Sequence, residues 1–474
     1  MPESRLIDRI AALITGVFRA IVPDPFVIAV LLLLLACLAG LAFGDFNSDV
    51  SLALADKLVR LTDAFRDNGP SPHIWSLLAF TMQMCLVLVS GHVLASTPLV
   101  GRAITALANV PRSGPSAAAL VGFIACLTGV MNWGLGLIAG ALLAREVGRS
   151  LARRSIPHHY PIIAAAGYFG LMVWHGGFSG SAPLTMTSMD GARRTLPADV
   201  VERLSTAGFA QGVPLDQTLF TAFNAFITLG LLVMVPAMLW FLAPRESRQQ
   251  SGSIAAPAEQ PQCSDVPRTL PVRLDASSLI PLCLAVALAA GLWRFLGVSG
   301  FNRLGLNEIA AAMLVLSLVL HGSSRRFVAA VDEAASSCGG IIVQFPIYAA
   351  IIGVVVASGL IRILADLAGS VSPALLPATT FLSACVINLF VPSGGGQWAV
   401  QGPIALSAAL DHGIAPGRII MAVAYGDQLT NMLQPFWALP LLAITGVKAR
   451  EIVGYTAIVM MLAGLWILLG LLIV

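Results

Sequence analysis

The sequence predicts an all-α polytopic membrane protein, and two observations support this fold class. Of its 474 residues, 57% are hydrophobic and only 11% are charged, whereas soluble domains carry about a quarter charged residues. Apolar runs long enough to cross a hydrocarbon core of roughly 30 Å also recur along the whole chain. The lipid bilayer is therefore an expected partner. The net charge of +3 gives no reason to expect nucleic acid as another.

The apolar runs predict roughly nine crossings. They are residues 24–43, 75–97, 160–186, 217–243, 277–297, 304–321, 339–362, 418–446 and 451–474. The segment Leu6–Val22 is more polar, and we expect it to lie at the membrane interface. Because this basic segment leads into a full-length span, no cleaved signal peptide is expected.

Two further apolar stretches are predicted to be re-entrant hairpins. Residues 115–146 are too many for one crossing and too few for two with a turn. Arginines flank both ends, with Arg112 before the stretch and Arg149, Arg153 and Arg154 after Arg145, so the positive-inside rule places both ends in the cytoplasm. The stretch 373–410 has the same form, with the Gly-rich sequence VPSGGGQW at its tip.

The order of these elements predicts an inverted repeat. Counting sides from a cytoplasmic N-terminus puts Lys448 and Arg450 in the cytoplasm and makes the two hairpins open to opposite sides. Residues 1–243 and 304–474 then form repeats of opposite orientation, joined by a cytoplasmic linker (244–276) and a connecting helix (277–303). The linker is rich in Ser, Gln and Pro, a composition typical of a flexible connector.

Each hairpin is followed by a broken apolar segment, and these breaks predict the functional site. The polar run Trp174–Ser181 interrupts 160–186, and Gly426–Pro435 interrupts 418–446. Unwound backbone in hydrocarbon leaves polar groups unpaired, at several kcal/mol each, unless it lines a wet cavity or holds a ligand. Corresponding breaks in two halves are typical of a secondary transporter. The predicted substrate-binding residues are Asn132, Trp133, Gly134, His175, Ser179, Ser181, Ser393, Gly394, Gly395, Gly396, Gln397, Gln428, Thr430 and Asn431.

Asp427 is the predicted ion-coupling residue, with His175 as the next candidate. It is the one carboxylate well inside a crossing segment, and an intramembrane carboxylate is by default a functional hypothesis. No Lys or Arg lies in the hairpin tips or the polar breaks. Helix N-termini and backbone N–H groups would therefore hold an anionic substrate, which suits a monoanion. Neighbouring aromatic residues could wall a small apolar tail: Trp133, Trp174, Phe178, Trp398, Phe436 and Trp437.

Parts of the sequence also fit two other functions, a channel and an intramembrane protease. Re-entrant loops also build channel filters, so a channel is an alternative. The sequence GFSG at Gly177–Gly180 matches the short pattern of intramembrane serine proteases, but no well-placed base accompanies it and no H-E-x-x-H pair is present. The seven cysteines form no C-x-x-C pair. We therefore expect no enzyme, no metal site and no cofactor.

Four long motifs resemble one known family. MNWGLGLIAGALLARE, WHGGFSGSAPL, VPSGGGQWAVQGP and GDQLTNMLQPFWALPLL are together similar to the bacterial short-chain fatty acid transporters, the acetoacetate and butyrate carriers of the ion-transporter superfamily. The resemblance implies a multi-pass inner-membrane carrier of a short-chain monocarboxylate, working by cation symport. It also implies a homodimer in which an elevator-type transport domain, built from the hairpins and broken helices, moves against a scaffold. That scaffold would be mostly residues 24–97, 217–243, 304–362 and 451–474.

The resemblance leaves the coupling ion and the exact anion open. Dicarboxylate relatives carry Ser-Asn-Thr type tips and use sodium, whereas the tips here read MNWG and PSGGGQW. This departure favours a proton over sodium. A carrier for another small organic anion, such as a dicarboxylate, is the alternative.

Overall fold

The computed structural model describes residues 16–17, 23–46, 52–66, 72–244, 269–299, 306–360, 362–363 and 372–473. Within these ranges the chain is almost entirely helical and contains no strand. Eight helices are long and apolar enough to cross a membrane. Large apolar side chains on α2 (Pro25–Phe43) and α14 (Leu279–Ser299) are exposed, as a lipid-facing surface requires. The predicted polytopic all-α class is confirmed.

The first predicted hairpin is a pair of antiparallel helices, α6 (Gly114–Met131) and α7 (Trp133–Arg153), which we call hairpin 1. Glycine lets the arms approach closely, since a Cβ added to Gly136 would lie 2.6 Å from the Cα of Gly129. A Cβ added to Gly140 would likewise lie close to Ala125. This second contact is four residues further from the tip on each arm, so the two helices run in opposite directions. The hairpin is longer than the predicted 115–146, and α6 alone could span a membrane. Re-entrance therefore stays a prediction.

The second hairpin, hairpin 2, comprises α19 (Leu376–Phe390) and α20 (Gly394–Asp411). The 3₁₀ turn η8 (Pro373–Leu375) precedes it. Two side-chain amides hold its arms together. Gln397 Nε2 donates to the Ala384 carbonyl over 3.0 Å, and Gln401 Nε2 donates to the Thr380 carbonyl over 3.3 Å. These bonds pair residues at matching depth on antiparallel helices.

Both predicted broken segments are broken. The first comprises α8 (Tyr160–Ala166), the 3₁₀ turns η2 (Phe169–Met172) and η3 (Trp174–Gly176), extended backbone at Gly177, and α9 (Ser181–Thr185). The second comprises α21 (Pro416–Thr430), the 3₁₀ turn η9 (Asn431–Leu433), extended backbone at Gln434, and α22 (Pro435–Thr445). Neither segment is a continuous crossing helix.

One prediction about the second break is wrong. The helix α21 continues through Gly426 to Thr430, so the break covers only Asn431–Gln434. Gly426 permits close packing instead, because a Cβ there would lie 2.5 Å from both the Phe381 carbonyl oxygen and the Ala384 Cβ on α19. Helix α21 accordingly packs along α19.

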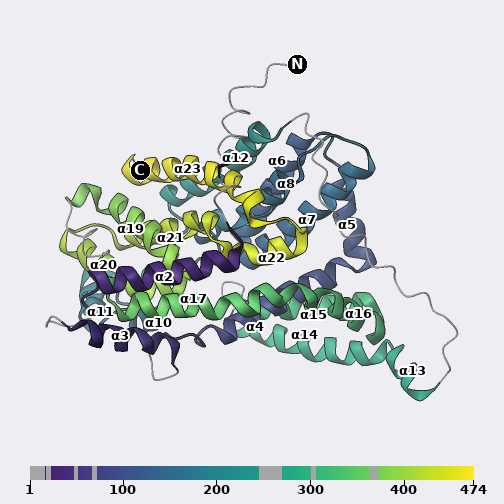
Figure 1. Ribbon diagram of the computed structural model, residues 1–474, viewed down its shortest axis with the longest axis horizontal. Coiled ribbons are helices and arrows are strands. Elements are labelled where there is room, and N and C mark those ends of the chain that lie inside the picture. Colours follow the sequence, from purple (N-terminus) through teal and green to yellow (C-terminus); the bar gives the residue numbers. More distant parts are fainter. Residues whose placement is uncertain are drawn as a thin grey trace.

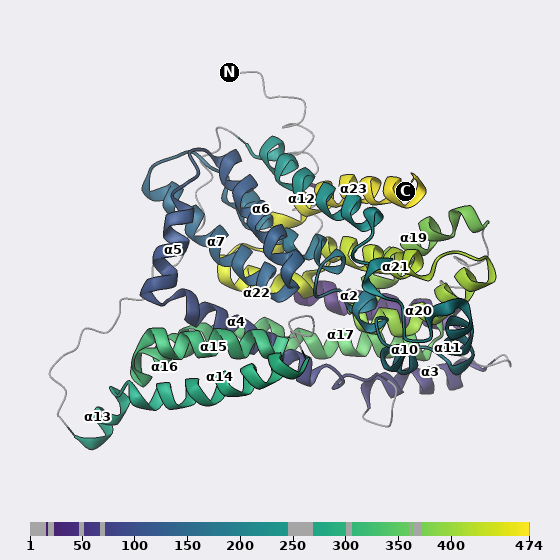
Figure 2. The ribbon, with the colours of Figure 1, turned by 180° about the vertical axis from the view of Figure 1, so that it is seen from behind.

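The remaining helices surround these four units. α12 packs against α6 and α23, α2 packs along α17, and α4 packs beside α15. Figures 1 and 2 show α14, α15 and α16 beside α4 at one end of the molecule, away from α19 and α20. The bounds of the longer members are α3 Leu54–Thr62, α4 Leu78–Ala95, α5 Pro98–Ala108, α12 Ala222–Leu242, α15 Leu306–His321, α16 Ser324–Ala335, α17 Gly339–Ala357 and α23 Ala449–Ile473. Two short helices, α10 (Met189–Thr195) and α11 (Ala198–Leu204), pack against hairpin 2.

Other expectations differ in detail. Most of the predicted interfacial helix 6–22, and residues 245–268 of the linker, lie outside the described residues. Beyond the Ser/Gln/Pro-rich stretch, the end of the 244–276 linker forms the short helix α13 (Leu270–Asp275). The chain does repeat the order hairpin then broken segment twice. The opposite orientation of the repeats, and the division at 243 and 304, stay predictions.

Candidate functional site

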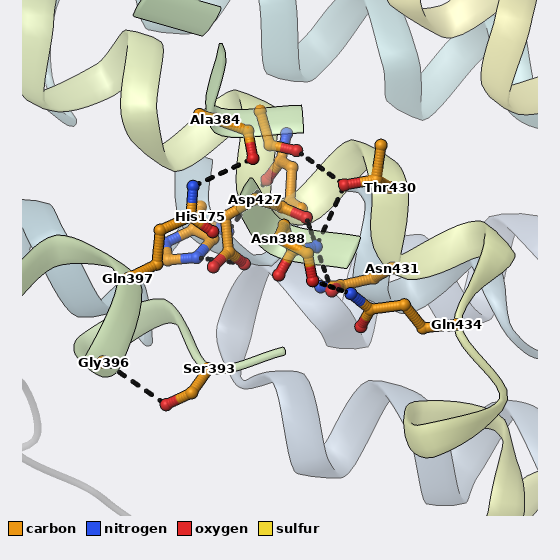
Figure 3. Close-up of polar contacts among 12 residues, drawn as sticks. His175, Ala384, Asn388, Ser393, Gly396, Gln397, Asp427, Thr430, Asn431 and Gln434 are labelled. Carbon is orange, nitrogen blue, oxygen red and sulfur yellow. Dashed lines mark hydrogen bonds and ion pairs between the residues drawn. The ribbon is translucent and has the colours of Figure 1, made fainter. Parts of the chain in front are cut away.

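A buried contact between a histidine and an aspartate joins the two broken segments. His175 in η3 places Nε2 3.0 Å from Asp427 Oδ1 on α21, as Figure 3 shows. Both residues are buried, with 0% and 2% of their surface exposed. The backbone N–H of His175 also donates to Gln428 Oε1 over 3.0 Å. The two residues predicted to couple the ion are therefore direct partners, although 252 positions separate them.

The unwound backbone around His175 is held by side chains from α12. Asn224 Nδ2 donates to the Gly176 carbonyl over 3.0 Å, and Asn224 Oδ1 accepts from the Tyr425 hydroxyl over 2.8 Å and from the Thr228 hydroxyl over 2.9 Å. A buried carbonyl that left the helical ladder thus regains a partner, which removes the penalty of leaving it bare. Sequence patterns gave no sign of Asn224, which lies within an apolar helix.

The tip of hairpin 1 satisfies its own backbone donors. Asn132 is the N-cap of α7, and its Oδ1 accepts from Gly134 and Leu135 N–H over 2.9 and 3.3 Å. The Trp133 N–H donates to Ser179 Oγ over 2.9 Å, and Phe178 N–H donates to the Val130 carbonyl over 2.8 Å. This tip and the first broken segment are therefore bonded together, and among the described residues the first turn of α7 leaves no backbone N–H free for a ligand.

The tip of hairpin 2 is different, because it leaves two backbone donors free. Ser393 caps α20, accepting from the Gly396 N–H over 3.3 Å. Within the described part of the chain, the N–H groups of Gly394 and Gly395 have no hydrogen-bond partner. An added Cβ at Gly394 would lie 2.8 Å from the His175 ring, whereas at Gly395 it would meet nothing within 4 Å. The N-terminus of a helix with free N–H groups is suited to an anion.

A cavity of about 290 Å³ lies at this tip. One wall belongs to the hairpin tips and broken segments, and the other belongs to α4 and α15. The lining residues are Phe80, Gln83, Trp133, Trp174, Ser181, Asn307, Glu308, Ser393, Gly394, Gly395 and Trp437. The rings of Trp133 and Trp437 meet edge to face with centroids 5.0 Å apart. The cavity thus combines free N–H donors and hydroxyls with an aromatic wall.

The structure divides the predicted site residues into two groups. Five line the cavity: Trp133, Ser181, Ser393, Gly394 and Gly395. The other nine lie outside its lining, mostly buried behind it: Asn132, Gly134, His175, Ser179, Gly396, Gln397, Gln428, Thr430 and Asn431. Of the predicted aromatic wall, Trp174 and Trp437 also line the cavity, while Trp398 is fully buried elsewhere and Phe178 is 45% exposed. Their contact with substrate stays a prediction.

Sequence reasoning missed the far wall and one buried hub. Phe80, Gln83, Asn307 and Glu308 come from helices without Gly-rich breaks. The hub is Asn388 on α19, whose Nδ2 lies 2.7 Å from the Asp427 carbonyl, 3.0 Å from Thr430 Oγ1 and 2.9 Å from Asn431 Oδ1. Its signal was a lone Asn in an apolar arm, three residues before the tip at Val391–Ser393.

Unpaired buried polar atoms concentrate around Asp427. Within the described part of the chain, six buried side-chain atoms have no hydrogen-bond partner: Asp427 Oδ2, His175 Nδ1, Asn388 Oδ1, Gln397 Oε1, Gln428 Nε2 and Asn431 Nδ2. Figure 3 shows Gln397 and Asn388 near the Asp427 carboxylate. Because native proteins leave few such atoms, a cluster of them needs a functional explanation.

Comparison with known proteins gives consistent results. The sequence model of a family described as short chain fatty acid transporter matches residues 6–474. A candidate short-chain fatty acid transporter of Escherichia coli is 35% identical over 98% of this chain and 99% of its own length. A second candidate short-chain fatty acid transporter, from Haemophilus influenzae, is 33% identical over 95% of this chain and 96% of its own length. Among solved structures, the YdaH transporter of Alcanivorax borkumensis aligns with a TM-score of 0.42 and 15% identity, covering 94% of this chain and 98% of that one.

Proposed function

Because the chain belongs to the short-chain fatty acid transporter family, we propose that it carries a short-chain monocarboxylate, such as butyrate or acetoacetate, in the cavity at the tip of hairpin 2. The family and the eight apolar helices make it a multi-pass transporter of the bacterial inner membrane. Its matched relatives are transporters rather than enzymes. The homodimer and the elevator movement stay predictions.

The observation that carries the proposal is the pair of free N–H groups at Gly394 and Gly395, which line the cavity. We assign the substrate carboxylate to these donors, with the hydroxyls of Ser181 and Ser393 beside them, and the short apolar tail to Trp133, Trp174 and Trp437. A volume of about 290 Å³ lies at the lower end of ligand pockets and suits a small molecule.

The charges in the cavity favour a monocarboxylate over a dicarboxylate. No Lys or Arg lines it, and one helix N-terminus supplies only about half a positive charge. Glu308 is in the far wall, so a second substrate carboxylate would share the cavity with a group of the same charge.

We assign ion coupling to the His175–Asp427 pair, with a proton as the coupling ion. The pair is buried directly behind the tip, where the Gly394 backbone packs against the His175 ring. One proton taken up with one monocarboxylate moves as a neutral combination, which lowers the electrostatic barrier in the membrane. Sodium symport is the second candidate, since Asp427 Oδ2, Asn388 Oδ1 and Gln397 Oε1 have no partner among the described residues, and carboxylate and amide oxygens are ligands that hard cations prefer.

The test is uptake of labelled butyrate and acetoacetate into proteoliposomes, with a pH gradient and a sodium gradient imposed separately. Proton symport predicts saturable accumulation with the pH gradient alone. Accumulation that requires sodium would support the second candidate. Flux that does not saturate and follows only the substrate gradient would indicate a channel, and transport of dicarboxylates but not monocarboxylates would refute the substrate assignment.

A further inference from the structure

A second cavity, of about 410 Å³, lies where α2, α17 and α23 begin and α22 ends. It shares no lining residue with the substrate cavity. Two cations, Lys448 and Arg450, stand in its wall. Both are exposed, and neither forms an ion pair with any described residue. The N-termini of α2 and α23 add partial positive charge at the same place.

Two carboxylates near the cavity equal the two cations in number, but each accepts from a backbone N–H at a helix N-terminus, and within the described ranges neither forms an ion pair with Lys448 or Arg450. Asp24 is the single acidic side chain in the lining, and its Oδ1 already accepts from the Phe26 N–H over 2.9 Å. Glu451 lies just beyond the cavity and caps the Lys448 N–H over 2.8 Å. The cavity mouth therefore favours an anion.

The interior of this cavity is apolar apart from one amide. Ile341, Leu439 and Leu442 form its wall. Gln344 is only 6% exposed, and its Oε1 has no partner, so a bound molecule that offers a hydroxyl donor would satisfy it. Further along α2 from the cavity, apolar side chains such as Leu31 and Leu34 are each 54% exposed, and a hydrocarbon chain can lie along this helix.

We propose that this cavity binds the headgroup of an anionic glycerophospholipid whose headgroup carries free hydroxyls, as in phosphatidylglycerol. The phosphate would lie between Lys448 and Arg450, a headgroup hydroxyl would donate to Gln344 Oε1, and an acyl chain would follow α2. A free phosphate compound would use the cations but not the apolar wall, so we commit to the lipid. The bound lipid would contact α22 together with α2, α17 and α23. The family resemblance implies that α22 belongs to the transport domain and that the other three helices belong mostly to the scaffold.

Native mass spectrometry of the purified full-length protein in mild detergent tests the proposal. The protein is titrated with phosphatidylglycerol, phosphatidylethanolamine of the same acyl chains, or glycerol 3-phosphate. We expect one phosphatidylglycerol to be retained preferentially. The double variant Lys448→Gln/Arg450→Gln should weaken its retention about tenfold or more, the value of one charge-assisted hydrogen bond. The control Arg325→Gln/Arg326→Gln removes two exposed cations of α16 and should bind like the wild type.

A third variant keeps the charges and fills the space. A Cβ at Gly340 would lie 3.7 Å from both Gln344 Nε2 and Leu439 Cδ2, so Gly340→Met extends into the cavity without a clash at its base. Gly340→Met should also fail to retain the lipid. If the double variant does not fold, this third variant still tests whether the cavity binds the lipid. Equal retention of both lipids by the wild type, glycerol 3-phosphate bound as tightly as the lipid, or unchanged retention in Gly340→Met would each overturn the proposal.

Discussion

Gly394→Ala tests whether the tip of hairpin 2 must sit directly against His175. The added Cβ would lie 2.8 Å from His175 Nε2 and Cε1 and 3.0 Å from Ser181 Oγ, distances that real Cβ atoms do not tolerate, so the tip has to shift. Overpacking of this kind costs about 1–3 kcal/mol. If this cost destabilises the ligand-bound conformation of the tip, butyrate affinity drops by roughly 5- to 150-fold.

Helix propensity acts in the opposite direction, because Ala in place of Gly stabilises a helix by up to about 1 kcal/mol. The thermal unfolding midpoint should therefore change little while binding weakens. Gly291→Ala in α14 is the control, since it makes the same chemical change in a helix outside the cavity lining, where an added Cβ would meet nothing within 4 Å. Equilibrium binding of labelled butyrate to the purified variants measures the effect. Wild-type affinity in Gly394→Ala, or equal losses in both variants, would refute the reasoning.

Three other variants test separate parts of the structure. Asp427→Asn should abolish accumulation of butyrate driven by a pH gradient while exchange of internal for external substrate persists; accumulation by this variant would remove Asp427 from the coupling role. Asn132→Ala should destabilise the protein by about 1–2 kcal/mol through loss of the α7 cap, visible in thermal unfolding, and an unchanged midpoint would mean that the tip is held elsewhere. In a cysteine-free background, Arg112→Cys and Arg153→Cys, both at exposed positions, should resist an impermeant thiol reagent added outside; labelling of one alone would make hairpin 1 a crossing.

The fold could be predicted from the sequence where a residue begins or ends a helix at its own position. Pro392 cannot continue a helix at low energy, and α19 does end just before it. The three glycines after Ser393 were expected to unwind, and this prediction is wrong, because they form the first turn of α20. Asn132 breaks the other hairpin as a cap. Gly426 was misread because a glycine that weakens a helix and a glycine that lets two helices touch look identical in a sequence. The nearby Ala384 decides between them.

The site was only partly predictable, because its contacts are long-range. His175 and Asp427 were each chosen as isolated polar residues in apolar segments, and nothing local indicates that they meet. The far wall of the cavity comes from Phe80, Gln83 and the start of α15, where no break or motif marks the chain. Asn388 was overlooked for a related reason, since its three acceptors all lie about 40 residues further along the chain.

The two hairpin tips differ in the hydrogen bonds that they form to other elements, and this difference affects how each tip can move. Lifting the tip of hairpin 1 breaks two hydrogen bonds, Trp133 to Ser179 and Phe178 to Val130, at a net loss of about 1–3 kcal/mol in total. Among the described residues, Val391–Gly396 of hairpin 2 form no hydrogen bond to any other element, so lifting that tip separates only packed surfaces. We therefore expect hairpin 2 to be the tip that opens to admit and release a ligand, and hairpin 1 to move with the segment to which it is bonded.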